Sequence, residues 1–138
     1  MNKNILIIFL TIISLILGVN TISKLNNSKE LHIEKNNLTE NQIPKTINSQ
    51  KIIDEVLFGL INSENNEIEL PNTKPDYTIK ISNKQKNIWW LEIFIWINEE
   101  QIIISSTKDI EKNKGNLYEK NTGIYHTINS IILKKEQI

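Results

Sequence analysis

The residues that could perform chemistry are few in this sequence and widely spaced. His32 and His126 are the two histidines, and the chain contains no cysteine. A zinc site needs three or four nitrogen, sulfur or carboxylate ligands, and a phosphate-binding cofactor usually needs a glycine-rich loop. Neither pattern is present, since the chain has only four glycines. The sequence therefore predicts no metal site and no cofactor.

A serine hydrolase triad is the one nucleophilic arrangement for which the residue types exist. Ser105 and Ser106 follow a predicted strand, Asp109 is close in sequence, and His126 comes later. The chain has no G-x-S-x-G nucleophile elbow. Paired carboxylates for glycoside hydrolysis would have to come from thirteen glutamates, and no spacing singles out two of them. No catalytic residue is assigned, and the prediction is a protein that is not an enzyme, with a hydrolase as the lesser alternative.

The residues best suited to binding lie in an aromatic strand at 88–97, whose sequence is IWWLEIFIWI. Side chains alternate between the two faces of a strand, and the odd positions are mostly aliphatic, as expected for a core face. The even positions carry Trp90, Phe94 and Trp96. If helices cover only one side of the sheet, these three side chains form an open partner-binding surface. The alternative is that residues 106–121 or the N-terminal segment cover them, because aromatic strands usually pack in a core.

An apolar segment precedes the elements that position these residues. Lys3 gives the chain a positive start, and Ile5–Val19 then reads ILIIFLTIISLILGV. A positive start followed by about fifteen apolar residues is the pattern of a signal peptide, and a few further residues would give the length of a membrane helix. The nearest approximation to a cleavage site is Thr21-Ile22-Ser23. Residues 1–23 are predicted to be a signal peptide or a membrane anchor, and both remain open.

The rest of the chain divides into a tether and one domain. Residues 24–45 are predicted to be a tether with a possible edge strand at Leu31–Ile33. Residues 46–138 are predicted to form the domain, which begins with a helix at 49–62. Its apolar residues recur at the helical period and are Ile52, Ile53, Val56, Leu57, Leu60 and Ile61. A second helix is predicted at 128–137.

The strand pattern completes the predicted fold. Tyr77, Ile79 and Ile81 alternate with polar residues, which predicts a half-buried strand before the aromatic one. Residues 101–105 are predicted to return beside the aromatic strand, and residues 124–127 to form a last short strand. The stretches at 62–75 and 106–121 are polar and are predicted to be loops. The expected fold class is α+β: a mostly antiparallel sheet of four or five strands with two helices, preceded by an N-terminal hydrophobic helix.

Charge and composition narrow the range of partners. Sixteen lysines balance sixteen acidic residues, and the chain has no arginine. A neutral chain without arginine lacks the field and the bidentate donors typical of nucleic-acid binding, which is not predicted. The abundance of Asn, Lys and Ile and the absence of Ala are typical of a low-GC bacterial genome. Without cysteine the chain has neither disulfides nor a lipid-modified N-terminal cysteine.

The segment Pro75–Ile81, PDYTIKI, resembles a strand of the YhfM-like domains of Firmicutes. In those domains a strand ending in LWI follows, and here Ile95-Trp96-Ile97 stands in its place. A tyrosine before a terminal LKK helix also fits, with Tyr125 and Leu133-Lys134-Lys135. The resemblance covers roughly residues 30–138 and implies a small lipoprotein-type or secreted domain of unassigned function, without catalytic residues to carry over. This chain departs from the lipoprotein pattern because Asn20 stands where a lipid-carrying cysteine would be.

These observations together predict a secreted or membrane-tethered domain at the extracytoplasmic face of the cell membrane. The N-terminal segment would contact the membrane, and the domain would bind a protein or envelope ligand. An alternative is an immunity or accessory protein that acts at the membrane itself, for which the N-terminal helix would matter beyond targeting.

Overall fold

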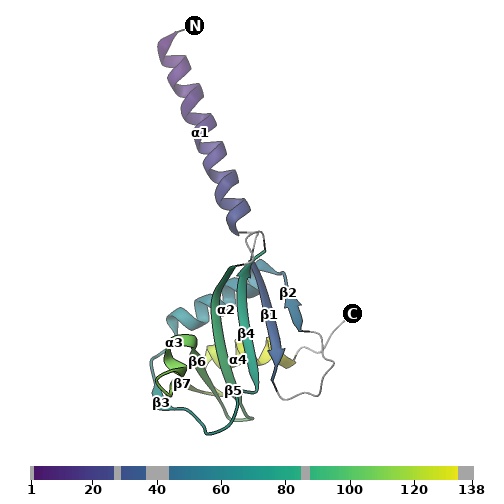
Figure 1. Ribbon diagram of the computed structural model, residues 1–138. Coiled ribbons are helices and arrows are strands. Elements are labelled where there is room, and N and C mark those ends of the chain that lie inside the picture. Colours follow the sequence, from purple (N-terminus) through teal and green to yellow (C-terminus); the bar gives the residue numbers. More distant parts are fainter. Residues whose placement is uncertain (1, 27–28, 37–43, 85–87, 134–138) are drawn as a thin grey trace.

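The computed structural model describes residues 2–26, 29–36, 44–84 and 88–133 (Figure 1). Its helices are α1 (Lys3–Asn26), α2 (Gln50–Asn62), α3 (Thr107–Ile110) and α4 (Gly123–Leu133). Its strands are β1 (Lys29–Lys35), β2 (Lys45–Ile47), β3 (Glu67–Glu69), β4 (Tyr77–Asn83), β5 (Ile88–Ile97), β6 (Gln101–Ser106) and β7 (Lys114–Glu119). All seven strands join one antiparallel sheet in the order β2-β1-β4-β5-β6-β7-β3.

The predicted fold class is therefore wrong in its number of elements. The described residues contain seven strands rather than four or five, and four helices rather than an N-terminal helix and two others. β3 and β7 lie within the stretches that were predicted to be loops. Both strands are polar, and their strand state comes from pairing, since β7 pairs with β6 on one side and with β3 on the other. Tertiary pairing commonly overrides a low intrinsic strand propensity.

The strand predicted at Leu31–Ile33 is present, but it does not lie at the edge of the sheet. It belongs to β1, which pairs with β2 on one side and with β4 on the other. This strand is therefore inside the sheet, and Leu31 is fully buried. The short β2 takes the edge position beside it.

One face of the sheet packs against α2 and α4, which lie behind it in Figure 1. The predicted helix at 49–62 is confirmed by α2, and its Ile53 and Val56 are fully buried. The strand side chains that face these helices occupy alternate positions along each strand, and they include Ile79, Ile93 and Ile95. This packing buries the largest apolar cluster of the domain and supplies most of its hydrophobic stabilisation.

The last helix begins earlier than predicted. α4 begins at Gly123, so the short strand expected at 124–127 is instead its first turn. The Thr122 hydroxyl oxygen accepts a hydrogen bond from the Tyr125 amide at 3.4 Å, as a residue preceding a helix commonly does. The predicted continuation of this helix to residue 137 lies outside the described residues.

The opposite face of the sheet is covered over β5, β6 and β7. Leu70, Trp96 and Ile103 form a second buried cluster there. Ile110 of α3 and Leu117 of β7 pack against it. The sheet therefore has one face that packs against two helices and a second face that is covered at one end only.

Gly115 in β7 makes this second cluster possible. A Cβ atom at this position would lie 2.8 Å from Leu70 Cδ2 and 3.1 Å from the Ile104 carbonyl oxygen. We expect Gly115→Val to lower the free energy of unfolding by about 1–3 kcal/mol, the usual cost of overpacking. Denaturant unfolding of the full chain measures this effect. Gly123→Val is the matched control, since nothing lies within 4 Å of a Cβ there, and an equal loss in both variants would contradict the close packing at Gly115.

α1 extends away from the sheet in Figure 1. Each of its large apolar side chains between Ile5 and Val19 is exposed, on every side of the helix. Within the described part of the chain, none of the helices combines the length and the apolar character needed to cross a membrane.

Candidate ligand-binding pocket and aromatic surface

The three aromatic residues predicted to form a binding surface lie in different surroundings. Trp96 is only 7% exposed, and its indole Nε1 donates a hydrogen bond to the Thr73 carbonyl oxygen at 2.9 Å. Phe94 is half-buried against the same second cluster. Trp90 is 50% exposed. The structure therefore separates Trp90 from Phe94 and Trp96, which pack beneath the segment after β3 and beneath α3.

A bulge in the pairing of β4 with β5 explains why Trp90 is exposed. Leu91 pairs with Ile81 and Trp89 pairs with Ser82, which leaves Trp90 without an opposite residue. A bulge inserts one residue and re-aims the side chains beside it. As a result, Trp89 replaces Trp90 on the face that carries Phe94 and Glu92.

The uncovered end of this face carries a row of polar residues across four strands. Thr46, His32, Lys80 and Glu92 are opposite one another in successive strand pairs. Thr46 Oγ1 lies 3.2 Å from His32 Nδ1, and Lys80 Nζ lies 3.7 Å from Glu92 Oε1. The ring of Trp89 meets His32 edge-on, with 5.4 Å between centroids. These polar groups are paired with one another, as expected of a stable solvated face.

The residues considered for a hydrolase triad are not brought together. The Ser105 hydroxyl is buried and donates to the Lys114 carbonyl oxygen at 2.7 Å. The Ser106 hydroxyl donates to Asp109 Oδ2 at 2.7 Å and accepts from the Asp109 amide, so it caps α3. His126 belongs to α4, on the other side of the sheet from α3. No serine–histidine hydrogen bond links these residues in the described structure.

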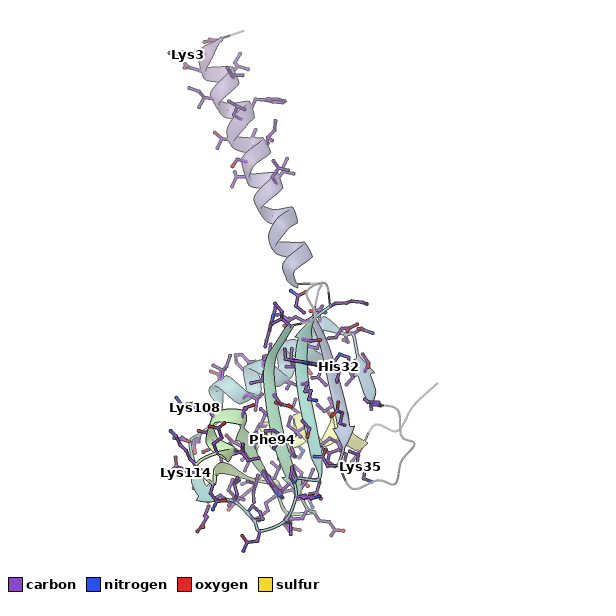
Figure 2. The ribbon with its side chains drawn as sticks, viewed as in Figure 1. Lys3, His32, Lys35, Phe94, Lys108 and Lys114 are labelled. Atoms are coloured by element: carbon purple, nitrogen blue, oxygen red, sulfur yellow. The ribbon has the colours of Figure 1, made fainter. Side chains whose placement is uncertain are left out.

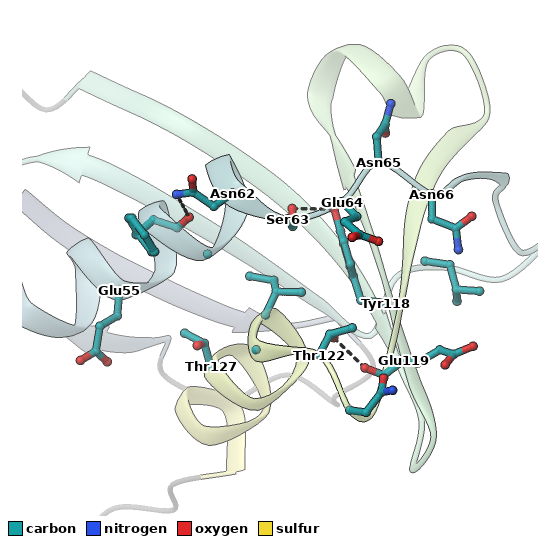
Figure 3. Close-up of a pocket in the computed structure, with 16 residues that line it drawn as sticks. Glu55, Asn62, Ser63, Glu64, Asn65, Asn66, Tyr118, Glu119, Thr122 and Thr127 are labelled. Carbon is teal, nitrogen blue, oxygen red and sulfur yellow. Dashed lines mark hydrogen bonds between the residues drawn. The ribbon is translucent and has the colours of Figure 1, made fainter.

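A pocket of about 870 Å³ lies between α2, β7 and α4 (Figure 3). Its walls come from the second half of α2, the segment at 62–66, the end of β7 and the first turns of α4. Ser63 Oγ and the Tyr118 hydroxyl are 3.0 Å apart and hydrogen-bonded. The Leu117 amide donates to the Asn66 carbonyl oxygen at 3.0 Å. These two hydrogen bonds hold the 62–66 segment against β7, so this wall of the pocket is fixed in place.

The lining of this α2–β7–α4 pocket has a clear chemical character. Its carboxylates are Glu55, Glu64 and Glu119, and its side-chain amides are Asn62, Asn65, Asn66 and Asn121. None of the described residues that line it is lysine or histidine. Phe58, which is 70% exposed, adds an aromatic ring at the rim. Such a lining favours ligands that donate hydrogen bonds and disfavours anions.

Sequence reasoning missed this pocket. Its residues come from two separate stretches of the chain, 55–66 and 117–127, and none belongs to a recognisable motif. The pattern of asparagines at 62–66 was available as a signal, but asparagines are also ordinary loop residues.

Two further observations concern ions and charge. Among the residues that the structure describes, no group of three or more histidine, aspartate or glutamate side chains is placed to hold a metal ion. The Glu67 carboxylate accepts a hydrogen bond from Lys114 Nζ at 2.6 Å, and this bond raises the pKa of Lys114 above its usual value. The pair joins the edge strand β3 to β7, away from the pocket.

No protein-family model, curated protein or solved structure matches this chain. The resemblance to YhfM-like domains therefore stays a prediction drawn from short motifs.

Proposed function

We propose that this chain is a non-enzymatic binding domain of the cell envelope, held at or beyond the membrane by its N-terminal segment. The support is that α1 presents apolar side chains on every side while the domain already has its own buried core. Removing apolar surface from water is favourable by about 25 cal/mol per Å². A bilayer offers the apolar side chains of α1 that environment, and the domain remains in water.

The proposed ligand site is the α2–β7–α4 pocket. Three carboxylates attract a positive group, since none of the described lining residues is lysine or histidine, and four amides supply further hydrogen-bonding atoms. Phe58 at the rim offers a ring face to a cation or to an apolar stem. A basic peptide segment of another envelope protein combines both features. The observation that supports this proposal is a pocket with a fixed wall, in which all the described charged lining residues are carboxylates.

Binding of short peptides to the full chain in detergent micelles tests the proposal. We expect a lysine-rich hexapeptide to bind and a glutamate-rich hexapeptide of the same length not to bind. The affinity should fall with added salt, because screening weakens attraction between partly exposed charges. Equal binding of both peptides would contradict the proposed ligand class.

A bulky residue in the pocket provides a second expected result. Thr127→Trp places a large ring on the wall that α4 contributes, and we expect it to weaken lysine-peptide binding at least about tenfold, or about 1.4 kcal/mol. Ser130→Trp is the matched control, since Ser130 is exposed on the same helix and outside the lining. Equal affinity of the two variants, measured by calorimetry, would place the peptide elsewhere.

A further inference from the structure

Three consecutive large apolar residues project at the beginning of β5. Ile88, Trp89 and Trp90, here named the tryptophan tip, are 53%, 49% and 50% exposed. The other exposed apolar side chains of the described domain are Phe58, Ile61 and Leu133, which belong to helices. Trp89 lies on the face of the sheet that carries Lys80, whereas Trp90 lies by Lys29, which pairs with Asp54 of α2. The tip therefore exposes apolar side chains on both sides of this end of the sheet, and exposed apolar surface on a small domain often marks a contact surface.

Cationic side chains hold the two indole rings of the tip. Lys29 Nζ lies 5.7 Å from the centroid of the Trp90 ring, and the same ammonium pairs with Asp54 of α2 at 3.4 Å. Lys80 Nζ lies 5.3 Å from the centroid of the Trp89 ring. Each ring is therefore supported on the side of the protein and open on the side of the solvent. Tryptophan in such a position has the apolar body and polar edge that favour the boundary between lipid and water.

The tip lies at the end of the sheet from which α1 departs. Lys29 at the start of β1 pairs with Asn83 of β4, and Asn83 pairs with Ile88. Two strand spacings of about 4.8 Å therefore separate Ile88 from Lys29 across the sheet. α1 ends at Asn26, three positions before Lys29. Figure 1 shows α1 leaving at this end, and Figure 2 shows His32, the ring neighbour of Trp89, closer to α1 than Phe94 is.

We propose that the tryptophan tip docks into the lipid–water interface of the membrane with which α1 associates. A chain that places α1 at a bilayer brings the tip to the surface of the same bilayer, because α1 ends three positions before Lys29, at the end of the sheet that carries the tip. Lys84 lies just after β4, and its side chain is 61% exposed although it pairs with Glu30 Oε1 at 3.5 Å. It adds a partly neutralised cation at the position that anionic headgroups would meet. Docking removes the exposed indoles from water and fixes which side of the domain faces away from the membrane. The proposal rests on the membrane association proposed above for α1.

Tryptophan fluorescence tests the docking directly, because Trp89, Trp90 and Trp96 are the chain's three tryptophans. The full chain is reconstituted in vesicles of phosphatidylcholine with a minority of phosphatidylglycerol, with bromine on the upper acyl chain of the lipid. We expect the bromolipid to remove the emission of Trp89 and Trp90 and aqueous iodide to leave it. The variant Trp89→Phe/Trp90→Phe retains only the buried Trp96, and we expect bromolipid to leave its emission intact.

Co-flotation of the protein with the same vesicles separates the two proposals. Protein that floats with the vesicles but is quenched by iodide and not by bromolipid would overturn the docking of the tip while leaving membrane association intact. Equal bromolipid quenching in the Trp89→Phe/Trp90→Phe variant would also overturn it. Protein that does not float would overturn both. Lys84→Glu is expected to reduce the quenching of the tip, whereas Lys108→Glu, on α3, is expected to leave it unchanged.

Discussion

Trp96→Ala is expected to lower the free energy of unfolding by about 3–5 kcal/mol, the usual range for removal of a buried tryptophan. The side chain is 7% exposed and packs against Leu70 and Ile103. The substitution also leaves the Thr73 carbonyl oxygen without the indole donor that it has at 2.9 Å. Both losses act on the same cluster, so the effect belongs near the top of the range. Urea unfolding followed by circular dichroism measures it.

Trp90→Ala is the matched control on the same strand. Trp90 is 50% exposed and lies at the bulge, so its truncation removes little packing and one cation–π contact with Lys29. We expect a loss below about 1 kcal/mol, the usual worth of such an exposed contact. Equal destabilisation by the two substitutions would contradict the separation of the aromatic strand into a covered end and an exposed end.

Ile53→Ala is expected to cost about 2–5 kcal/mol, because it leaves a cavity between α2 and the sheet. Ile53 is fully buried in the larger of the two clusters. α2 contacts both α4 and β1, so the surrounding structure has little freedom to collapse into the space. The midpoint of thermal or denaturant unfolding of the full chain reports this loss.

Ile61→Ala serves as the control for the same helix. Ile61 is 80% exposed, and alanine favours a helix slightly more than isoleucine does. We expect its free energy of unfolding to change by less than about 0.5 kcal/mol, as is usual for surface substitutions. A cost comparable to that of Ile53→Ala would mean that α2 packs on the sheet through a different face.

The elements with a strong apolar period could be predicted from the sequence, and the polar ones could not. The alternation in β4, the apolar run of β5 and the stripe of α2 each bury a face, so pattern and structure agree. β7 has the sequence KGNLYE and β3 has EIE, and neither pattern distinguishes a strand from a loop. These strands form because β6 offers a free edge, which no local pattern reveals.

The candidate surfaces show the same limit. Alternation along β5 assigned Trp90 to the face of Phe94 and Trp96, but one bulge changed that assignment for the start of the strand. A bulge depends on the register of two strands, and the residues at 88–91 are all apolar, so their order carries no sign of it. The pocket likewise depends on where α2 and α4 meet the end of β7, which only tertiary packing determines.

Fractionation of cells that make the native protein, followed by N-terminal sequencing, tests the proposed envelope location most directly. The expected result is recovery in the membrane fraction with the domain accessible to external protease, or recovery outside the cell as a chain that begins near residue 23. Recovery of the intact chain, with its N-terminal segment, from the soluble fraction of the cell interior would contradict it.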